Sequence, residues 1–143
     1  MSMIEFIIPG PPQGKARPRV VRTKSGRSMS FTPDKTVAYE ELVRARYTAA
    51  CHPAEPLQGP VCVEVAAWYS IPQSASKKRH AAMLNGSEYP TKKPDCDNVL
   101  KIICDALNGI AYHDDAQVVH SSVDKRFSDF PHVDVRIREV AET

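Results

Sequence analysis

An amphipathic segment between Asp95 and Gly109 constrains the fold more than any other part of the chain. Its apolar residues are Val99, Ile102, Ile103, Ala106, Leu107 and Ile110. They recur at the spacing of one helix face, so they require a helix that packs against another layer. Asp95 stands at or near the N-cap position, and Gly109 is well placed for the C-cap. The sequence therefore predicts a helix from Asp95 to Asn108 whose apolar face lies on a sheet.

The opposite face of this predicted helix is charged. Asp97, Lys101, Asp105 and Asn108 follow one another at steps of four, four and three residues, so they form one polar stripe. Asp97 and Lys101 can therefore face the same pocket. The partial positive charge of the helix N-terminus stabilises Asp95 and Asp97 as carboxylates. A purely structural interpretation also fits: an N-cap, a first-turn acid and its lysine partner at i+4.

A second acidic pair, Asp114-Asp115, follows the helix and is typical of a turn when taken alone. A strand from Val118 to Phe127 would run back beside the helix and could bring this pair to the helix N-terminus. Grouped carboxylates need a compensating cation, and oxygen-only ligands favour Mg²⁺ or Mn²⁺. Because adjacent residues of an extended segment point oppositely, at most one of the two aspartates should be a direct ligand.

The remaining periodicity predicts an α+β domain. Strands are expected over Ile4–Ile8, Val61–Ile71, Val118–Phe127 and Val133–Val140, the last two joined as a terminal hairpin, and a further hairpin over Val20–Thr32 turning at Ser25-Gly26. A short basic helix is expected over Ser74–Leu84. This order predicts a mixed or antiparallel sheet with two main helices packed on one face.

Another helix is expected after Thr32-Pro33-Asp34, with the threonine as N-cap and the proline in the first turn. It should run for about 17 residues, until prolines end it. Its predicted apolar stripe consists of Val37, Leu42, Val43 and Tyr47, with Ala50 as a candidate fifth member.

Basic residues are unevenly distributed although the formal net charge is only +2. The first basic stretch has no acidic residue and contains Lys15, Arg17, Arg19, Arg22, Lys24 and Arg27. The second contains Lys77, Lys78, Arg79, Lys92 and Lys93 against a single Glu88. Basic stretches on both sides of an acidic site are the arrangement expected when a polyanion is gripped around a metal-filled pocket.

The length of 143 residues and the 42% hydrophobic content predict one compact domain over residues 1–143. No run approaches the roughly 18 apolar residues of a membrane span, and the start of the chain lacks a signal-peptide pattern. We therefore expect a cytoplasmic protein without membrane contact. Four cysteines without a C-x-x-C pair predict reduced, mostly buried thiols: Cys51, Cys62, Cys96 and Cys104.

The chain resembles the RusA family of Holliday junction resolvases over nearly its whole length. The strongest likeness is residues 93–101, K-P-D-C-D-N-V-L-K, which resemble the family's K-P-D-x-D-N-hydrophobic-x-K motif. Residues 105–109 (D-A-L-N-G) and 114–118 (D-D-A-Q-V) continue it. The early segment Pro9–Arg19 and Thr32-Pro33 also resemble family features.

The resemblance implies a Mg²⁺-dependent endodeoxyribonuclease, with Mn²⁺ as a substitute, that acts in DNA recombination and repair. It implies a homodimer that cleaves four-way DNA junctions, each subunit nicking one of two opposed strands. The family's metal-binding aspartates fall on Asp95, Asp97 and Asp115, with Asp114 as a candidate additional ligand, and its essential lysine falls on Lys101. The family is common in phages and prophages.

Contacts with the junction are expected through backbone charge, so we predict DNA-binding roles for Lys15, Arg17, Arg19, Lys92 and Lys93. Cys96 stands where the family usually has an apolar residue and is expected to be a buried small hydrophobe. His113 stands where the family varies, and no catalytic role is expected for it.

Two other functions remain open at this level. One is a less selective branched-DNA or flap nuclease with the same metal chemistry. The other is a catalytically silent junction-binding protein. Intact Asp95, Asp97, Lys101 and Asp115 argue against the silent protein, because a carboxylate cluster repels phosphate and gives a pure binder no advantage.

Overall fold

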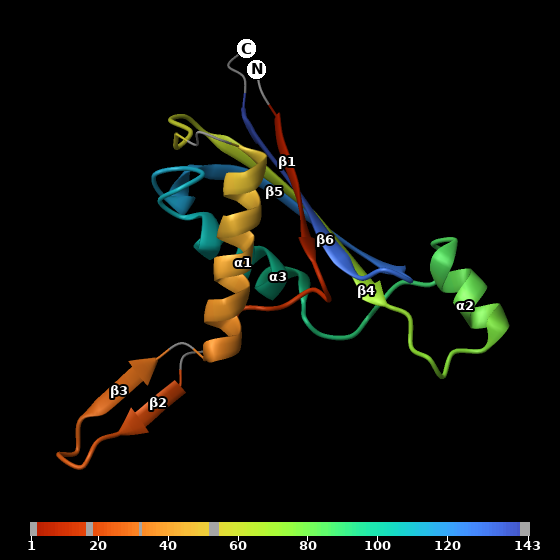
Figure 1. The fold of residues 1–143 in the computed structure, drawn as a ribbon, viewed down its shortest axis with the longest axis horizontal. Helices are drawn as coiled ribbons and strands as arrows, with labels where there is room; N and C mark the ends of the chain where they lie inside the picture. The colour runs from red at the N-terminus through yellow and green to blue at the C-terminus, as the bar shows by residue number, and fades with distance from the viewer. Residues whose placement is uncertain (1–2, 17–18, 32, 52–54, 141–143) are drawn as a thin grey trace.

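The computed structural model describes residues 3–16, 19–31, 33–51 and 55–140, which form a mixed sheet with helices on one face (Figure 1). In chain order the elements are β1 (Met3–Pro9), β2 (Arg19–Arg22), β3 (Ser28–Phe31), α1 (Asp34–Ala50), β4 (Val61–Ser70), α2 (Lys77–Leu84), α3 (Cys96–Leu107), the 3-10 turn η1 (Asp115–Gln117), β5 (Val118–Ser128) and β6 (His132–Glu139). The α+β prediction, with α1 and α3 as the two main helices on one face, is confirmed.

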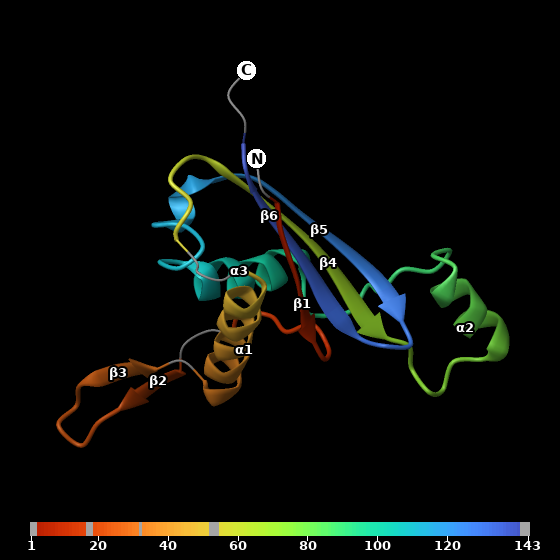
Figure 2. The ribbon, with the colours of Figure 1, turned by 45° about the horizontal axis from the view of Figure 1, so that its top comes forward.

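The main sheet has the order β1-β6-β4-β5. β4 pairs with β6 in antiparallel fashion and with β5 in parallel fashion, so the sheet is mixed. Alternate residues of β4, from Val61 through Val63 and Val65 to Ala67, are at most 2% exposed and belong to the core. These side chains pack under α1 and α3, which lie together on one side of the sheet (Figure 2).

The predicted terminal hairpin is wrong, because β4 lies between β5 and β6. Ser128 of β5 pairs with Ser70, and His132 of β6 pairs with Trp68, so the short connection crosses the end of β4. β4 is apolar or small at nearly every position, which suits a strand with neighbours on both sides. Proximity in sequence favoured a hairpin, but burial of β4 decides the order.

Helix α1 has the predicted length but a different buried face. Its buried residues are Thr36, Tyr39, Val43 and Tyr47. Val37 is 39% exposed and Ala50 is exposed, so the predicted stripe is correct only around Leu42, Val43 and Tyr47. Thr36 and Tyr39, which the predicted stripe left out, are buried in place of Val37 and Ala50. Pro33 occupies the N-cap position, and Thr32 lies outside the described residues.

Helix α3 matches its prediction closely. Asp95 is the N-cap residue, Asn108 is the C-cap residue, and Gly109 follows with a φ of +86° that favours glycine. Val99, Ile102, Ile103, Ala106 and Leu107 are fully buried. The helical phase deduced from the sequence therefore fixes which side chains of α3 are left for chemistry.

The β2–β3 hairpin and α2, which carry parts of the two basic stretches, lie at opposite ends of the molecule. The predicted hairpin is confirmed as β2 and β3, which pair Val21 with Met29 and stand away from the sheet (Figure 1). Helix α2 lies beyond the far end of the sheet in both ribbon views (Figure 2), and Ser76 caps it by accepting a hydrogen bond from the Arg79 amide. Among the described residues, no helix has the length and apolar character needed to cross a membrane.

Candidate active site

The polar stripe of α3 lines an open pocket together with η1. Asp97, Lys101 and Asp105 come from the helix, and Asp115 comes from the 3-10 turn. Leu100, Cys104 and Val118 form the apolar part of a space of about 300 Å³. Asp97 and Lys101 thus share a pocket, as the helical spacing predicted, and Asp115 joins them from a separate segment. Asp95 is exposed at the N-cap and does not line this pocket.

Asp115 is positioned by the end of α3. Its backbone amide donates a hydrogen bond of 2.9 Å to Asn108 Oδ1. The loop therefore meets the C-terminal half of α3. The sequence had suggested that it would meet the N-terminus of this helix, and that expectation is wrong. The cause is that β5 runs antiparallel to α3: Cys96 Sγ lies 3.9 Å from the Val123 carbonyl oxygen, whereas Val118 lies beside Cys104 in the pocket.

Asp114 has a different role from Asp115 in this turn. Its carboxylate accepts a hydrogen bond of 3.3 Å from the Ala116 amide, while Gln117 Oε1 accepts one of 3.0 Å from the Asp114 amide. Gln117 Nε2 also donates to the Leu57 carbonyl oxygen at 2.8 Å, which holds η1 against the body of the protein. Asp114 is extended, but Asp115 already belongs to the 3-10 turn, so the segment is not a continuous strand. Reciprocal capping, and not strand alternation, gives the two aspartates different roles.

Ion pairs connect the pocket to the first basic stretch. Asp105 Oδ2 lies 3.5 Å from Lys101 Nζ and 3.2 Å from Lys15 Nζ, and Lys15 Nζ also lies 3.0 Å from Glu40 Oε2. The structural interpretation paired Lys101 with Asp97, but Lys101 pairs with Asp105. The i+4 spacing after Lys101 could have indicated Asp105. The contact with Lys15 has no signal in the sequence, because Lys15 is far away along the chain.

Helix capping does not explain the presence of Asp95 at the start of α3. Asp95 occupies the N-cap position, yet its side chain accepts no hydrogen bond from the helix amides. The pKa of Asp115 is raised, chiefly by a hydrogen bond with the Asp114 side chain and then by burial and by the charges of Asp114 and Asp105, while Lys101 acts to lower it. The site therefore holds more negative charge than its lysines balance, which favours a cation.

The loop before α3 is held by Tyr69 and Lys125. The Tyr69 hydroxyl donates a hydrogen bond of 2.6 Å to the Pro94 carbonyl oxygen, and burial raises the pKa of Tyr69 to about 12, so this donor stays protonated. Lys125 Nζ lies 5.0 Å from the centre of the Tyr69 ring and donates to the Lys92 carbonyl oxygen at 2.7 Å. Asp95 is thereby attached to the ends of β4 and β5.

The predicted DNA contacts are placed unevenly. Lys92 and Lys93 are exposed on the loop before α3. Lys15 is 20% exposed and takes part in two ion pairs. Arg17 and the side chain of Arg19 lie outside what the structure describes. Sequence reasoning gave no individual role to the exposed basic residues of the hairpin, which are Arg22, Lys24 and Arg27.

Of the cysteines only Cys104 lines the pocket, where it adds apolar surface, and His113 does not line it. The prediction that Cys96 is buried is wrong: it is exposed, because it is the first residue of α3 and lies outside the helix's buried face. Cys62 is buried and Cys104 is partly buried. His113 is exposed, and its backbone amide donates to Gln117 Oε1 at 2.7 Å.

The donor chemistry of the pocket fits a hard divalent cation. Its ionisable oxygen donors are the carboxylates of Asp97, Asp105 and Asp115. Mg²⁺ prefers such oxygen ligands over softer nitrogen or sulfur ligands. Within the described part of the chain, no three His, Cys, Asp or Glu side chains converge tightly enough to form a metal-binding group. Asp97 and Asp115 nevertheless line the same pocket, and Asp95 stands at the N-cap of the helix that carries Asp97.

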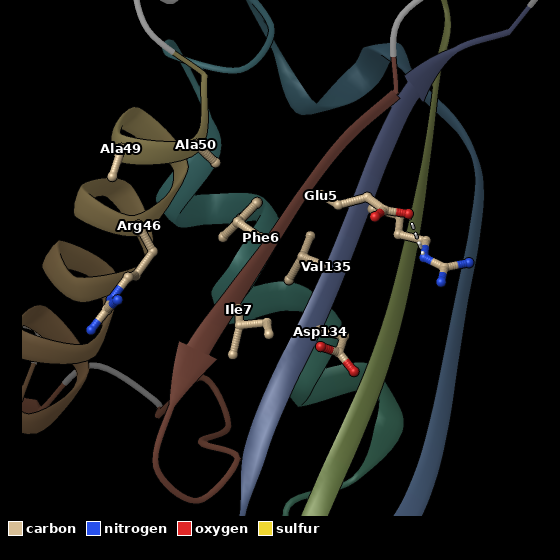
Figure 3. A pocket seen from close by; sticks show the side chains of 9 residues that line it. Glu5, Phe6, Ile7, Arg46, Ala49, Ala50, Asp134 and Val135 are labelled. Carbon is tan, nitrogen blue, oxygen red and sulfur yellow. Dashed lines mark ion pairs between the residues drawn. The ribbon is translucent and has the colours of Figure 1, made fainter.

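A larger pocket of about 560 Å³ lies between β1 and α1, but its charged residues are mostly engaged (Figure 3). Glu5 pairs with Arg136 at 3.1 Å, and Asp134 accepts a hydrogen bond of 2.9 Å from Trp68 Nε1. Phe6 points toward α1 and Arg46 comes from the helix itself. The carboxylates of this pocket are already paired and do not form a cluster like that of Asp97, Asp105 and Asp115. The candidate active site is therefore the α3 pocket.

Comparison with known proteins identifies the family of the chain. The model of the family described as endodeoxyribonuclease RusA matches residues 9–138, which include the whole of α3 and η1. A protein of Bacillus subtilis strain 168, described as uncharacterized protein YqaN, is 36% identical over 143 residues, covering 99% of each chain. The match therefore extends over the basic stretches as well as the pocket.

Proposed function

Because this chain belongs to the RusA family of endodeoxyribonucleases, we propose that it resolves four-way DNA junctions by paired nicks in recombination and repair. It acts as a homodimer with Mg²⁺, for which Mn²⁺ can substitute. The observation that carries this proposal is the meeting of Asp97, Lys101 and Asp115 at one pocket from two separate segments. An acidic pocket that also presents a lysine suits hydrolysis of a phosphodiester better than simple phosphate binding.

The residues of the pocket take different roles. Asp97 and Asp115 hold the cation, with Asp95 as the third ligand by family correspondence, and Asp114 stays with its capping role. A Mg²⁺ ion held there would supply Lewis-acid chemistry, for activation of water and for stabilisation of the leaving 3′ oxygen. Lys101 is 60% exposed beside these carboxylates, so its ammonium can reach the scissile phosphate and stabilise its developing charge.

The DNA is held on both sides of the pocket through its phosphates. Lys92 and Lys93 flank the start of α3, and the exposed Arg22, Lys24 and Arg27 lie on the β2–β3 hairpin. The hairpin stands away from the sheet and apart from the loop before α3. This separation supports a substrate that spans more than one duplex arm, because a short linear duplex would not need both groups of basic residues.

The proposal is tested with a labelled synthetic four-way junction. Asp97→Asn should abolish Mg²⁺-dependent cleavage while the protein still binds the junction, since the fold does not depend on this exposed carboxylate. Asp124→Asn, which replaces an exposed aspartate on β5 outside the α3 pocket, is the matched control and should cut normally. Unchanged cleavage by Asp97→Asn would remove the proposal.

The same assay separates the other candidate functions. Equal cleavage rates on flaps, forks and junctions would favour a less selective branched-DNA nuclease. Tight junction binding without cleavage in either Mg²⁺ or Mn²⁺ would favour a silent junction-binding protein.

A further inference from the structure

We infer that Asp105 and Lys15 form a positioning pair for Lys101, in which Asp105 directs the Lys101 ammonium and Lys15 balances Asp105 and attaches the first basic stretch to α3. Neither residue touches the metal or the DNA in this assignment. The inference rests on the proposed function for the role of Lys101. It replaces the expectation that Lys15 grips a phosphate.

The geometry places one carboxylate oxygen between two ammonium groups. Asp105 Oδ2 lies 3.2 Å from Lys15 Nζ and 3.5 Å from Lys101 Nζ. Lys15 is 20% exposed and Asp105 is 24% exposed, whereas Lys101 is 60% exposed. Asp105 therefore interacts more closely with the sheltered Lys15 than with the exposed Lys101. The longer contact leaves the Lys101 ammonium in the pocket and open to solvent.

The charges of the network explain why Lys15 is needed. Glu40 is only 12% exposed and shares Lys15 with Asp105, so two sheltered carboxylates meet one sheltered ammonium. Without Lys15, both carboxylates would lack a close cation on that side, and Asp105 would attract Lys101 more strongly. Burial lowers the pKa of Lys15, but hydrogen bonds to Glu40 and Asp105 outweigh it, so the net shift is upward and the lysine stays charged.

The backbone before Lys15 is fitted to α3 independently of these ion pairs. The Lys15 amide donates a hydrogen bond of 3.0 Å to the Asn98 carbonyl oxygen. A Cβ on Gly14 would lie 2.8 Å from Pro94 Cβ and 3.1 Å from Asn98 Cβ. Such a close approach is open only to glycine. The segment that leads to the β2–β3 hairpin is therefore seated on the turn that carries Asp97.

Two other roles would fit the same residues, and they predict different behaviour. If Asp105 were a metal ligand, its loss would raise the Mg²⁺ concentration needed for half-maximal cleavage. If Lys15 gripped a phosphate, its loss would weaken junction binding and reduce the salt slope of binding by about 1. A positioning pair changes kcat and leaves both of these quantities unchanged.

The test uses Asp105→Asn, Lys15→Met and the double variant on the labelled four-way junction, with Lys35→Met as the control at an exposed lysine of α1. Each single variant should lower kcat by about 10-fold to 100-fold, with KM and half-saturating Mg²⁺ unchanged. The double variant should be no slower than the slower single variant, because the residues act as a unit. Lys15→Arg should restore most of the rate.

A second measurement does not depend on cleavage, so failure of the inference is distinguishable from failure of the proposed function. The Lys15 ammonium should give a slowly exchanging NMR signal in the free protein, whose chemical shift changes in Asp105→Asn and stays the same in Lys35→Met, because Glu40 holds the ammonium in both variants. If the wild-type protein did not cleave the junction, the proposed function would be overturned and the inference about the Lys15–Asp105 contact would still be measurable by NMR. An unchanged Lys15 signal, an unchanged kcat or a raised Mg²⁺ requirement in Asp105→Asn would overturn the inference.

Discussion

The backbone amide of Asp115 and the side-chain carbonyl of Asn108 are joined by a hydrogen bond of 2.9 Å. This bond fixes η1 to the last turn of α3 and so sets where Asp115 stands relative to Asp97 and Lys101. The pocket therefore depends on a residue that ends a helix as well as on the acids that line it.

Replacing Asn108 by leucine removes this acceptor while keeping the size of the side chain. We expect kcat for junction cleavage to fall by about 10-fold to 100-fold, because Asp115 loses its support. The loss of stability should be about 1 kcal/mol, measured by chemical denaturation. Asn85→Leu is the matched control: Asn85 also ends a helix and accepts a bond of 2.9 Å from the Ser87 amide. It should lose similar stability but keep its activity.

The Tyr69 hydroxyl is expected to matter for the loop that carries Asp95. Tyr69→Phe keeps the ring under Lys125 but removes the donor to the Pro94 carbonyl oxygen, so it should cost about 1 kcal/mol of unfolding free energy. Cleavage should slow while junction binding is kept. Tyr89→Phe, which removes an exposed hydroxyl bonded to Arg126, should change neither quantity appreciably. Equal effects of the two variants would contradict a special role for Tyr69.

Gly14→Ala tests the seating of the N-terminal segment on α3. The new methyl group would meet Pro94 Cβ at 2.8 Å, and overpacking of this kind costs about 1 to 3 kcal/mol. Cleavage should fall with it, because Pro94 and Asn98 flank Asp95 and Asp97. A Cβ at Gly59 meets no atom within 4 Å, so Gly59→Ala should be tolerated. Thermal denaturation and the junction assay measure both outcomes.

Ionised Asp115 should lower the stability of the folded protein although the site needs its carboxylate. Its pKa is raised in the folded state, so its ionised form is disfavoured there, and the cost is present above the ordinary carboxyl pKa and disappears as the pH falls below it. Asp115→Asn should therefore raise the melting temperature at neutral pH in EDTA and have little effect in acid. Asp34→Asn, which removes a favourable acid from the first turn of α1, should lower the melting temperature at neutral pH. A stabilising effect that persists unchanged in acid would exclude charge repulsion as the cause.

Sequence periodicity was sufficient for α3 and for the side of it that carries chemistry. Its apolar residues recur at regular helical spacing within one short segment, so the sequence alone placed Asp97 and Lys101 correctly on the same face. Helix α1 was placed correctly in the chain, but its buried face was assigned only in part, because Thr36 and Tyr39 are buried where the prediction had Val37.

Contacts between distant segments were not accessible in the same way. The position of β4 between β5 and β6 depends on pairing along both of its edges, and the three-residue connection between β5 and β6 suggested a hairpin instead. The conformation at Asp114-Asp115 depends on Gln117, whose side chain closes the capping pair and also reaches the Leu57 carbonyl oxygen. The Lys15–Asp105 pair exists only because the N-terminal segment lies on α3.

The most direct test of the proposed function is to map the nicks made in a four-way junction labelled on each strand in turn, with the wild-type protein and Asp115→Asn side by side. The wild-type protein should make paired, symmetric nicks in two opposed strands when Mg²⁺ is added, and Asp115→Asn should bind the junction without cutting it. Scattered or unpaired nicks, or the same paired nicks from Asp115→Asn, would contradict a junction resolvase built on the α3 pocket.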